Sequence, residues 1–287
     1  MLPPDTKILI VGLGLIGGSY AEGLKKAGFE VGAVTRSRST LDFALQKGII
    51  DSGSIEVERD YVSLFDIVVF ALYPHVLLSW IEEHQDCIKP GALLTDVTGV
   101  KRAVVYSVQQ MLRPDLEFVG AHPMAGREVY GVENADSAIF RGANYIVTPT
   151  EANSERALQA CEDLGRALGF GNITRLSPER HDEMIGFLSQ LTHCIAVALM
   201  NSKESHHLVD FTGDSFRDLT RIARINDGMW SELFMLNRDE LLSQMDLFSE
   251  KFGELRNALA EGDTEKMREM MRISTERRSY FDKGKKV

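Results

Sequence analysis

Three glycines near the start of the chain, in the stretch ILIVGLGLIGGSYAEGLKKAG (residues 8–28), constrain the fold more than any other feature. They follow an apolar run, precede a helical pattern and have the spacing GxGxxG. The first glycine permits a tight turn, the second lets a diphosphate approach the backbone, and the third allows close helix packing. The helix N-terminus then faces the anion. The stretch therefore predicts a dinucleotide site, with a purely structural glycine turn as the alternative. The candidate residues are Gly12, Gly14, Leu15, Ile16 and Gly17.

Short apolar runs alternate with helical patterns through the first 170 residues. The runs cover residues 7–11, 30–35, 66–72, 92–97, 117–121 and 144–149. Strands separated by helices are typical of βαβ units and a parallel sheet. Beyond about residue 170 the chain becomes almost wholly helical, with Pro178 suited to a first helical turn. We therefore expect an α/β fold, with a Rossmann-type doubly wound, mainly parallel sheet in residues 1–170 and an all-helical domain in residues 171–287.

A heptad-like seam runs through the helical part of the chain. Apolar residues recur at alternating spacings of four and three at Leu241, Met245, Phe248, Phe252, Leu255 and Leu259. Such a seam needs a partner helix. The partner belongs either to the same chain or to a second subunit, and the pattern leaves both open.

Composition and charge narrow the class of protein. A net charge of −10 and a pI near 5.3 argue against a general binder of nucleic acid or of an acidic membrane. The N-terminus lacks a signal-peptide pattern, and no run approaches the roughly 18 apolar residues of a membrane span. The three cysteines lack CxxC spacing, which indicates reduced thiols. We expect a cytoplasmic protein that acts on a small molecule, without a metal site, because the adjacent His206 and His207 would point apart on a helix.

The turn after the second expected strand bears on the choice of dinucleotide. An Asp or Glu at this position would hold the 2′-hydroxyl of NAD. The sequence instead reads AVTRSRST, so that Thr35, Arg36, Ser37 and Arg38 offer hydroxyls and positive charge. These groups suit a 2′-phosphate and favour NADP. A solvated basic turn that still accepts NAD is the alternative.

Three further motifs accompany the glycine loop. They are HPMAGRE at residues 122–128, LSQLTH at residues 188–193 and FRDLTRIARINDGMW at residues 216–230. Taken in this order, over roughly residues 7 to 240, the motifs resemble the prephenate and arogenate dehydrogenase family. The resemblance implies a dinucleotide-binding domain followed by a helical dimerisation domain, and hence a homodimer. It also implies oxidative decarboxylation of prephenate to 4-hydroxyphenylpyruvate, or of arogenate to tyrosine.

His122 is the candidate base for this chemistry. Hydride leaves the ring carbon that bears the 4-hydroxyl, the hydroxyl proton must be accepted, and carbon dioxide departs as the ring becomes aromatic. A neutral imidazole is suited to accept that proton. His122 follows a predicted strand at the carboxyl end, where doubly wound sheets bind ligands, and it matches the family's catalytic histidine. By position alone, a lone histidine at a strand end is more often a structural residue.

The substrate's carboxylates require cations. Arg217, Arg221 and Arg224 have i, i+4, i+7 spacing, which by itself indicates one solvated helix face. The resemblance singles out Arg221 as the arginine that binds a substrate carboxylate, since a guanidinium matches that group at two points. It also implies that His193 contacts the substrate.

The roles of two further residues in the matched segments stay open. His181 matches a family histidine, and its structural and functional interpretations stand side by side. Trp230 either lines the pocket or serves as a buried aromatic anchor.

Two positions depart from the family pattern. Where many members have glycine and serine before VK, this chain has Thr98 and Gly99. We expect the Thr98 hydroxyl to be a candidate replacement for that serine. The second departure is Arg127, which favours prephenate over arogenate because the prephenate side chain carries a carboxylate and no ammonium group. A surface pair between Arg127 and Glu128 is the alternative.

Other classes of protein remain open at this point. A 3-hydroxyacid dehydrogenase or a pyrroline-carboxylate reductase would share the glycine loop and the helical second domain. A dinucleotide sensor without catalytic activity would bind the cofactor and turn over no substrate. The two kinds of reductase do not explain the segments HPMAGRE and RDLTRIA together.

Overall fold

The computed structural model describes residues 1–204 and 206–282, and the chain divides into two compact units. The first unit covers residues 1–237, and the second begins at Arg238. This division by contacts differs from the sequence-based boundary near residue 170, which stays a prediction.

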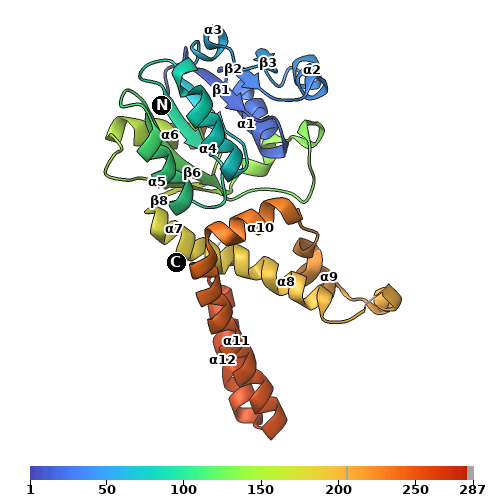
Figure 1. Ribbon diagram of the computed structural model, residues 1–287. Coiled ribbons are helices and arrows are strands. Elements are labelled where there is room, and N and C mark those ends of the chain that lie inside the picture. Colours follow the sequence, from blue (N-terminus) through green and yellow to red (C-terminus); the bar gives the residue numbers. More distant parts are fainter. Residues whose placement is uncertain (205, 283–287) are drawn as a thin grey trace. The chain divides into compact units, whose positions relative to one another are not determined.

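A single sheet forms the centre of the first unit (Figure 1). Within the described residues its strands are β1 (Lys7–Val11), β2 (Glu30–Val34), β3 (Ser52–Ser54), β4 (Ile67–Phe70), β5 (Leu93–Asp96), β6 (Glu117–Pro123), β7 (Asn144–Thr148) and β8 (Asn172–Arg175). The order across the sheet is β3-β2-β1-β4-β5-β6-β7-β8. Strands pair in parallel except where β7 runs antiparallel to β6. The prediction of a Rossmann-type, mainly parallel sheet is confirmed.

Alternating side chains of β1 explain why both faces of the sheet are covered. Ile8 and Ile10 belong to one hydrophobic cluster, and Leu9 and Val11 belong to the other. Because successive strand residues point to opposite faces, a strand that is apolar throughout needs a layer on each side. Residues of α1, α2 and α6 complete the first cluster, and residues of α4, α5 and α10 complete the second.

The helices have the following bounds. They are α1 (Leu15–Lys26), α2 (Arg38–Gln46), α3 (Arg59–Val62), α4 (Pro74–His84), α5 (Arg102–Met111), α6 (Glu155–Ala167), α7 (Pro178–Ile185), α8 (Thr192–Asn201), α9 (Asp214–Thr220), α10 (Asp227–Leu236), α11 (Arg238–Glu261) and α12 (Thr264–Ser279). Short 3₁₀ segments are η1 (Gln85–Cys87), η2 (Val132–Asn134), η3 (Ser137–Phe140), η5 (His206–Phe211) and η6 (Arg221–Ala223). A π-helical segment, η4 (Gly186–Leu191), joins α7 to α8.

Two short strands were not expected from the sequence. β3 and β8 are the outermost strands, and their sequences SGS and NITR contain at most one apolar residue. Edge strands bury little surface, so they need no apolar run to form. β8 also carries the sheet past residue 170, into the segment expected to be helical.

The continuous helix Pro178–Asn201 is long and apolar enough to be a candidate membrane span by length and composition alone. Its length and mean hydropathy of 1.4 would suit a bilayer, and 28% of the apolar window is buried. The helix contains no uninterrupted apolar run of membrane-spanning length, because polar residues such as Gln190 and His193 interrupt its apolar part. The side chains of His181, Asp182 and Gln190 on this helix are buried in the first unit. One side of this helix therefore takes part in a buried network of hydrogen bonds.

The second unit is a pair of helices, α11 and α12, that pack against each other. Gly262 has φ +70°, and Asp263 caps α12 by accepting from the backbone N–H of Lys266. The expected heptad seam lies on α11, where Phe252 remains 62% exposed and Leu259 68% exposed. The intramolecular partner thus leaves a substantial part of the seam uncovered.

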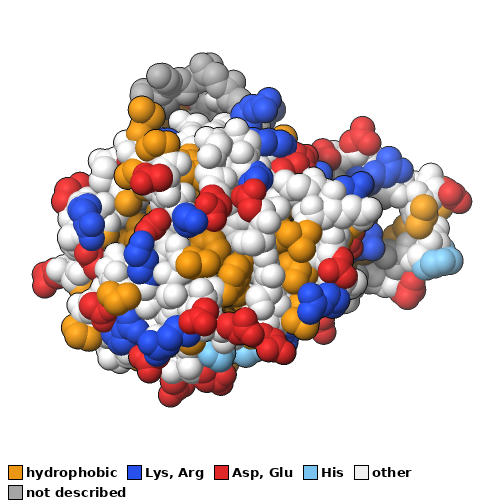
Figure 2. Space-filling model, turned by 90° about the horizontal axis from the view of Figure 1, so that it is seen from above, with side chains coloured by type: hydrophobic (Ala, Val, Ile, Leu, Met, Phe, Trp, Pro, Cys, Tyr) orange, Lys and Arg blue, Asp and Glu red, His pale blue; other side chains and the backbone are white. Residues whose placement is uncertain are grey.

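Charges of both signs share the molecular surface. On the face shown in Figure 2, Lys and Arg side chains are interspersed with Asp and Glu side chains. A nucleic-acid-binding face would instead gather basic side chains in a patch or stripe. This view agrees with the low pI in arguing against a broad basic surface on that face.

Candidate active site

The glycine loop between β1 and α1 has the geometry of a diphosphate cradle. Gly12 has φ +98°, and a Cβ there would lie 2.5 Å from the carbonyl oxygen of Ala71. A Cβ on Gly17 would lie 1.9 Å from the carbonyl oxygen of Gly12, whereas one on Gly14 would meet nothing within 4 Å. Two glycines are therefore required by packing, and Gly14 leaves open space before the N-terminus of α1. A dinucleotide diphosphate fits this arrangement.

The four candidate residues for cofactor choice lie at the carboxyl end of β2, beside the glycine loop. The Ser37 hydroxyl accepts a hydrogen bond from the backbone N–H of Thr40 and caps α2. Arg36 and Arg38 are exposed. Ser37 therefore has a structural task, while both guanidinium groups face solvent at the edge where the adenosine end of a dinucleotide would lie.

His122 lies near the carboxyl end of β6, on the same edge of the sheet as the glycine loop. Its Nδ1 atom is 2.9 Å from Nε2 of His181, which belongs to α7. Burial lowers the pKa of His122 well below its usual value of 6.5, and the charges of His181 and Lys101 lower it further. His122 is thus a neutral imidazole at neutral pH, as a general base must be.

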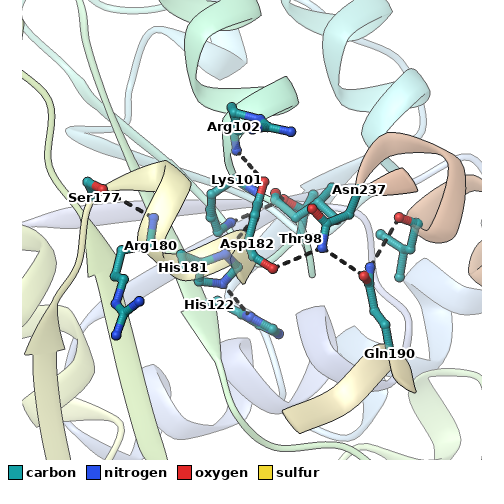
Figure 3. A network of polar contacts seen from close by, with 12 residues as sticks. Thr98, Lys101, Arg102, His122, Ser177, Arg180, His181, Asp182, Gln190 and Asn237 are labelled. Carbon is teal, nitrogen blue, oxygen red and sulfur yellow. Dashed lines mark hydrogen bonds and ion pairs between the residues drawn. The ribbon is translucent and has the colours of Figure 1, made fainter. Parts of the chain in front are cut away.

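His181 is held in turn by Asp182, a residue that the sequence analysis did not single out. Nδ1 of His181 is 2.7 Å from Oδ1 of Asp182. The backbone N–H groups of Lys101 and Arg102, at the start of α5, donate to Oδ1 and Oδ2 of Asp182 over 2.8 and 2.9 Å. His181 and Asp182 are fully buried. Figure 3 shows these residues converging from α5, β6 and α7.

Polar contacts on the other side hold the main chain of Asp182. The Asn237 side-chain amide donates to the carbonyl oxygen of Asp182 over 2.9 Å and to Oε1 of Gln190 over 2.8 Å. The Gln190 side-chain amide donates to the carbonyl oxygen of Leu233 over 3.1 Å. The two residues of each hydrogen-bonded pair lie more than 40 positions apart in the chain, so no local sequence pattern predicts the network (Figure 3).

Thr98 belongs to a buried cluster at the end of β5 that is joined to this network through Lys101. Its hydroxyl contacts Oδ2 of Asp96 and the carbonyl oxygen of Val100, and it accepts from the Lys101 ammonium over 3.1 Å. The Lys101 ammonium also lies 2.5 Å from Oδ2 of Asp96, with both side chains fully buried. Oδ1 of Asp96 accepts from the backbone N–H of Ala121, next to His122. The cluster thus supports the strand that carries His122.

Replacing Thr98 by Val tests whether its hydroxyl also has a catalytic role. The variant leaves the buried Asp96 and Lys101 with one partner fewer, so we expect the free energy of unfolding to fall by about 1–3 kcal/mol with kcat nearly unchanged. Urea unfolding and steady-state assays measure the two quantities. Thr174→Val, at an exposed position of β8, is the matched control. A large loss of kcat without loss of stability would instead support the serine-like role.

The structure corrects the expectation that three arginines share one helix face. Helix α9 ends at Thr220 and Arg221 begins the 3₁₀ segment η6, so Arg217, Arg221 and Arg224 do not share one α-helical face. The three-residue turn breaks the expected periodicity. Arg221 pairs with Glu128, in the loop that follows β6. That contact brings the Arg221 segment to the loop beyond His122.

Arg127 does not pair with its neighbour Glu128, so that alternative is wrong. Its guanidinium lies 2.5 Å from Oδ2 of Asp136, which caps η3. Successive residues of this extended loop point in different directions, and each reaches a different partner. The proposed role of Arg127 in substrate choice stays a prediction.

His193 and Trp230 lie together on the helices that face this loop. Their ring centroids are 3.8 Å apart, and Nδ1 of His193 lies 2.9 Å from the carbonyl oxygen of Ser189, in the π-helical segment. Burial lowers the pKa of His193, while that carbonyl contact and the nearby Glu128 oppose the shift. π-Helical turns often occur at functional sites because they free backbone groups for side chains. The π-helical segment thus helps to hold the His193 ring against the Trp230 ring.

Comparisons with known proteins agree with this arrangement. Residues 20–170 match the model of the prephenate dehydrogenase nucleotide-binding domain, and residues 177–273 match that of the prephenate dehydrogenase dimerisation domain. The chain is similar to a prephenate dehydrogenase of Bacillus subtilis (strain 168), with 29% identity over 269 residues, 91% of this chain and 72% of the relative.

Two solved structures extend the comparison. The chain resembles prephenate dehydrogenase from A. aeolicus in complex with hydroxyphenyl propionate and NAD⁺, with a TM-score of 0.88 and 26% identity over 96% of this chain and 98% of that one. Arogenate dehydrogenase of Synechocystis shares the fold, with a TM-score of 0.83 and 24% identity over 96% of this chain and 100% of that one.

Proposed function

The chain belongs to the prephenate dehydrogenase family, and we propose that it oxidatively decarboxylates prephenate to 4-hydroxyphenylpyruvate in tyrosine biosynthesis, with hydride transfer to NAD(P)⁺. The observation that carries the proposal is the position of His122. It lies at the same sheet edge as the glycine loop, as a neutral imidazole held by a second histidine. A dinucleotide in the cradle supplies the hydride acceptor, and His122 supplies the base.

The residues of this chain then account for each proton and charge. Nε2 of His122 accepts the proton of the 4-hydroxyl as hydride leaves the same ring carbon. The bond to the carboxylate breaks, carbon dioxide leaves, and the bonding electrons enter the ring. The imidazolium returns its proton to the phenolate oxygen, which regenerates neutral His122. Arg221 binds a carboxylate of the substrate through its guanidinium, and His193 and Trp230 form the adjacent wall.

Arogenate is the alternative substrate of the same family. Its side chain carries an ammonium group beside the carboxylate, which a basic residue in the pocket would disfavour. Arg127 lies in the loop that follows His122. Its positive charge would repel the ammonium group of arogenate, which supports prephenate as the substrate.

We also propose a preferred cofactor, an assembly and a cellular location. The exposed Arg36 and Arg38 at the end of β2 support NADP over NAD. The uncovered seam on α11 and the matched dimerisation domain support a homodimer. We propose a cytoplasmic enzyme on the basis of its similarity to biosynthetic dehydrogenases.

A spectrophotometric screen of prephenate and arogenate with NAD⁺ and NADP⁺ tests the proposal. Reduction of the cofactor is followed at 340 nm, and we expect the largest kcat/KM for prephenate with NADP⁺. Arg38→Ala should lower kcat/KM with NADP⁺ by about tenfold and leave NAD⁺ little affected, since one charge-assisted contact to the 2′-phosphate is lost. Exclusive use of arogenate would overturn the substrate assignment. A clear preference of the unmodified enzyme for NAD⁺ would overturn the cofactor assignment.

A further inference from the structure

We propose that Asp182 is a positioning residue that sets the tautomers of His181 and His122, leaving Nε2 of His122 unprotonated and ready to accept the substrate proton. The inference rests on the proposed function only for the role of His122 as base. Its structural content, a chain of three side chains with one direction of hydrogen bonding, can be tested without substrate.

The direction of the chain starts at the N-terminus of α5. The backbone N–H groups of Lys101 and Arg102 point at the two carboxylate oxygens of Asp182. A backbone N–H can only donate, so both oxygens act as acceptors. α5 has no side-chain cap of its own, and Asp182 reaches it from α7. Asp182 thereby supplies acceptors for the N-terminal N–H groups of α5.

The same logic passes through the two imidazoles. Oδ1 of Asp182 is an acceptor 2.7 Å from Nδ1 of His181, so that Nδ1 carries the hydrogen. A neutral His181 then has a lone pair on Nε2, which lies 2.9 Å from Nδ1 of His122. That contact needs one hydrogen, and His122 supplies it. Nε2 of His122 is therefore left with its lone pair.

This arrangement accommodates charge on only one of the two histidines. When His122 gains a proton on Nε2, its Nδ1–H still donates to His181, and no contact changes. A proton on Nε2 of His181 would instead face the Nδ1–H of His122. The other charged groups near His122 are Lys101 and its partner Asp96, at the end of β5. The three hydrogen-bonded side chains therefore direct the incoming proton to His122.

The tautomers can be read directly by ¹⁵N NMR of histidine-labelled protein without substrate. We expect both His122 and His181 to carry their hydrogen on Nδ1 at pH 7.5, with assignment from the variants His122→Asn and His181→Gln. An Nε2-protonated His122 in the unmodified protein would overturn the proposal. Because the measurement needs no turnover, it stands even if the enzyme uses neither prephenate nor arogenate.

Asp182→Asn tests the consequence for catalysis. An asparagine amide can donate to Nδ1 of His181 and so reverse both tautomers. We expect kcat to fall by at least about tenfold with an unchanged dissociation constant for the cofactor; a wrong tautomer costs far more where the carboxylate contacts the catalytic histidine directly. Glu183→Gln, the same change at the next residue, alters only an exposed pair with Arg180 and is the control. Equal kcat and equal pH profiles in the two variants would refute the role of Asp182.

A second pair of variants covers the case in which Asp182→Asn does not fold. His181→Gln keeps an amide oxygen that can accept from Nδ1 of His122, whereas His181→Leu cannot accept. Both leave Asp182 to hold the start of α5. We expect the Gln variant to retain at least about tenfold more kcat than the Leu variant at similar thermal stability. Equal activities of the two variants would contradict the role of His181 in orienting His122. If the unmodified enzyme turned over neither substrate, that result would instead count against the proposed function.

Discussion

His122→Asn is expected to lower kcat by about 10²- to 10⁴-fold, the range by which a positioned general base accelerates proton transfer. Asparagine fills similar space and can hydrogen-bond, but it cannot accept a proton at physiological pH. The loss should appear in steady-state assays with prephenate, while the dissociation constant of the cofactor, followed by fluorescence, should change little because the glycine loop is untouched. Near-normal turnover would refute the assignment of His122 as base.

The same histidine sets the expected pH dependence. His122 acts as a base only when neutral, and its pKa is lowered well below 6.5 by burial and by the charges of His181 and Lys101. Activity should therefore be level from about pH 6.5 into the neutral range and should fall only as the pH drops through the lowered pKa. Because the base is missing, the residual activity of His122→Asn should not show this acid limb. A limb centred above pH 6.5 would contradict the environment described for His122.

Arg221→Ala is expected to raise KM for prephenate by about 10- to 100-fold, with a much smaller effect on kcat. A hydrogen bond to a charged group contributes about 1.5–3 kcal/mol, which corresponds to such a factor. Arg221 is exposed and pairs with Glu128. In the substrate-free enzyme its guanidinium therefore already has a partner, which a substrate carboxylate must replace. Steady-state kinetics over a wide range of prephenate concentrations separate the two parameters.

Two further variants identify the source of the effect on KM. Glu128→Gln removes the competing carboxylate, so KM should stay equal or fall, opposite in sign to Arg221→Ala. Arg166→Ala removes another exposed ion-pair partner, on α6, and should leave KM unchanged. If Arg221→Ala matched the Arg166 control, Arg221 would be only a surface partner of Glu128.

Local patterns were sufficient to predict the dinucleotide-binding part of the molecule. The spacing of Gly12, Gly14 and Gly17 after an apolar strand is a property of consecutive residues, and the turn that requires it forms within the same residues. The apolar runs likewise identified β1, β2, β4, β5, β6 and β7, because strands buried on both faces must be apolar throughout. The edge strands β3 and β8 escaped prediction because exposure removes that requirement.

The candidate site was predictable only where a single residue carried the signal. His122 stood at a strand end within a recognisable motif, and the structure places it at the carboxyl end of β6, on the same side of the sheet as the glycine loop. Asp182 carried no signal of its own, since an acidic residue in SPERHDE is typical of any exposed helix start. Its burial follows from the donors of α5, 80 residues earlier in the chain.

The sequence by itself determined the class of fold, the glycine cradle and the residue types available for chemistry, because each depends on neighbours along the chain. Only the tertiary structure decided the pairings: Arg221 with Glu128 rather than Arg127 with Glu128, Asp182 with the start of α5, and His122 with His181. Hydrogen bonds and ion pairs depend on distances of about 3 Å between groups. Chain separation does not encode such distances, and only the packing of distant segments against one another creates them.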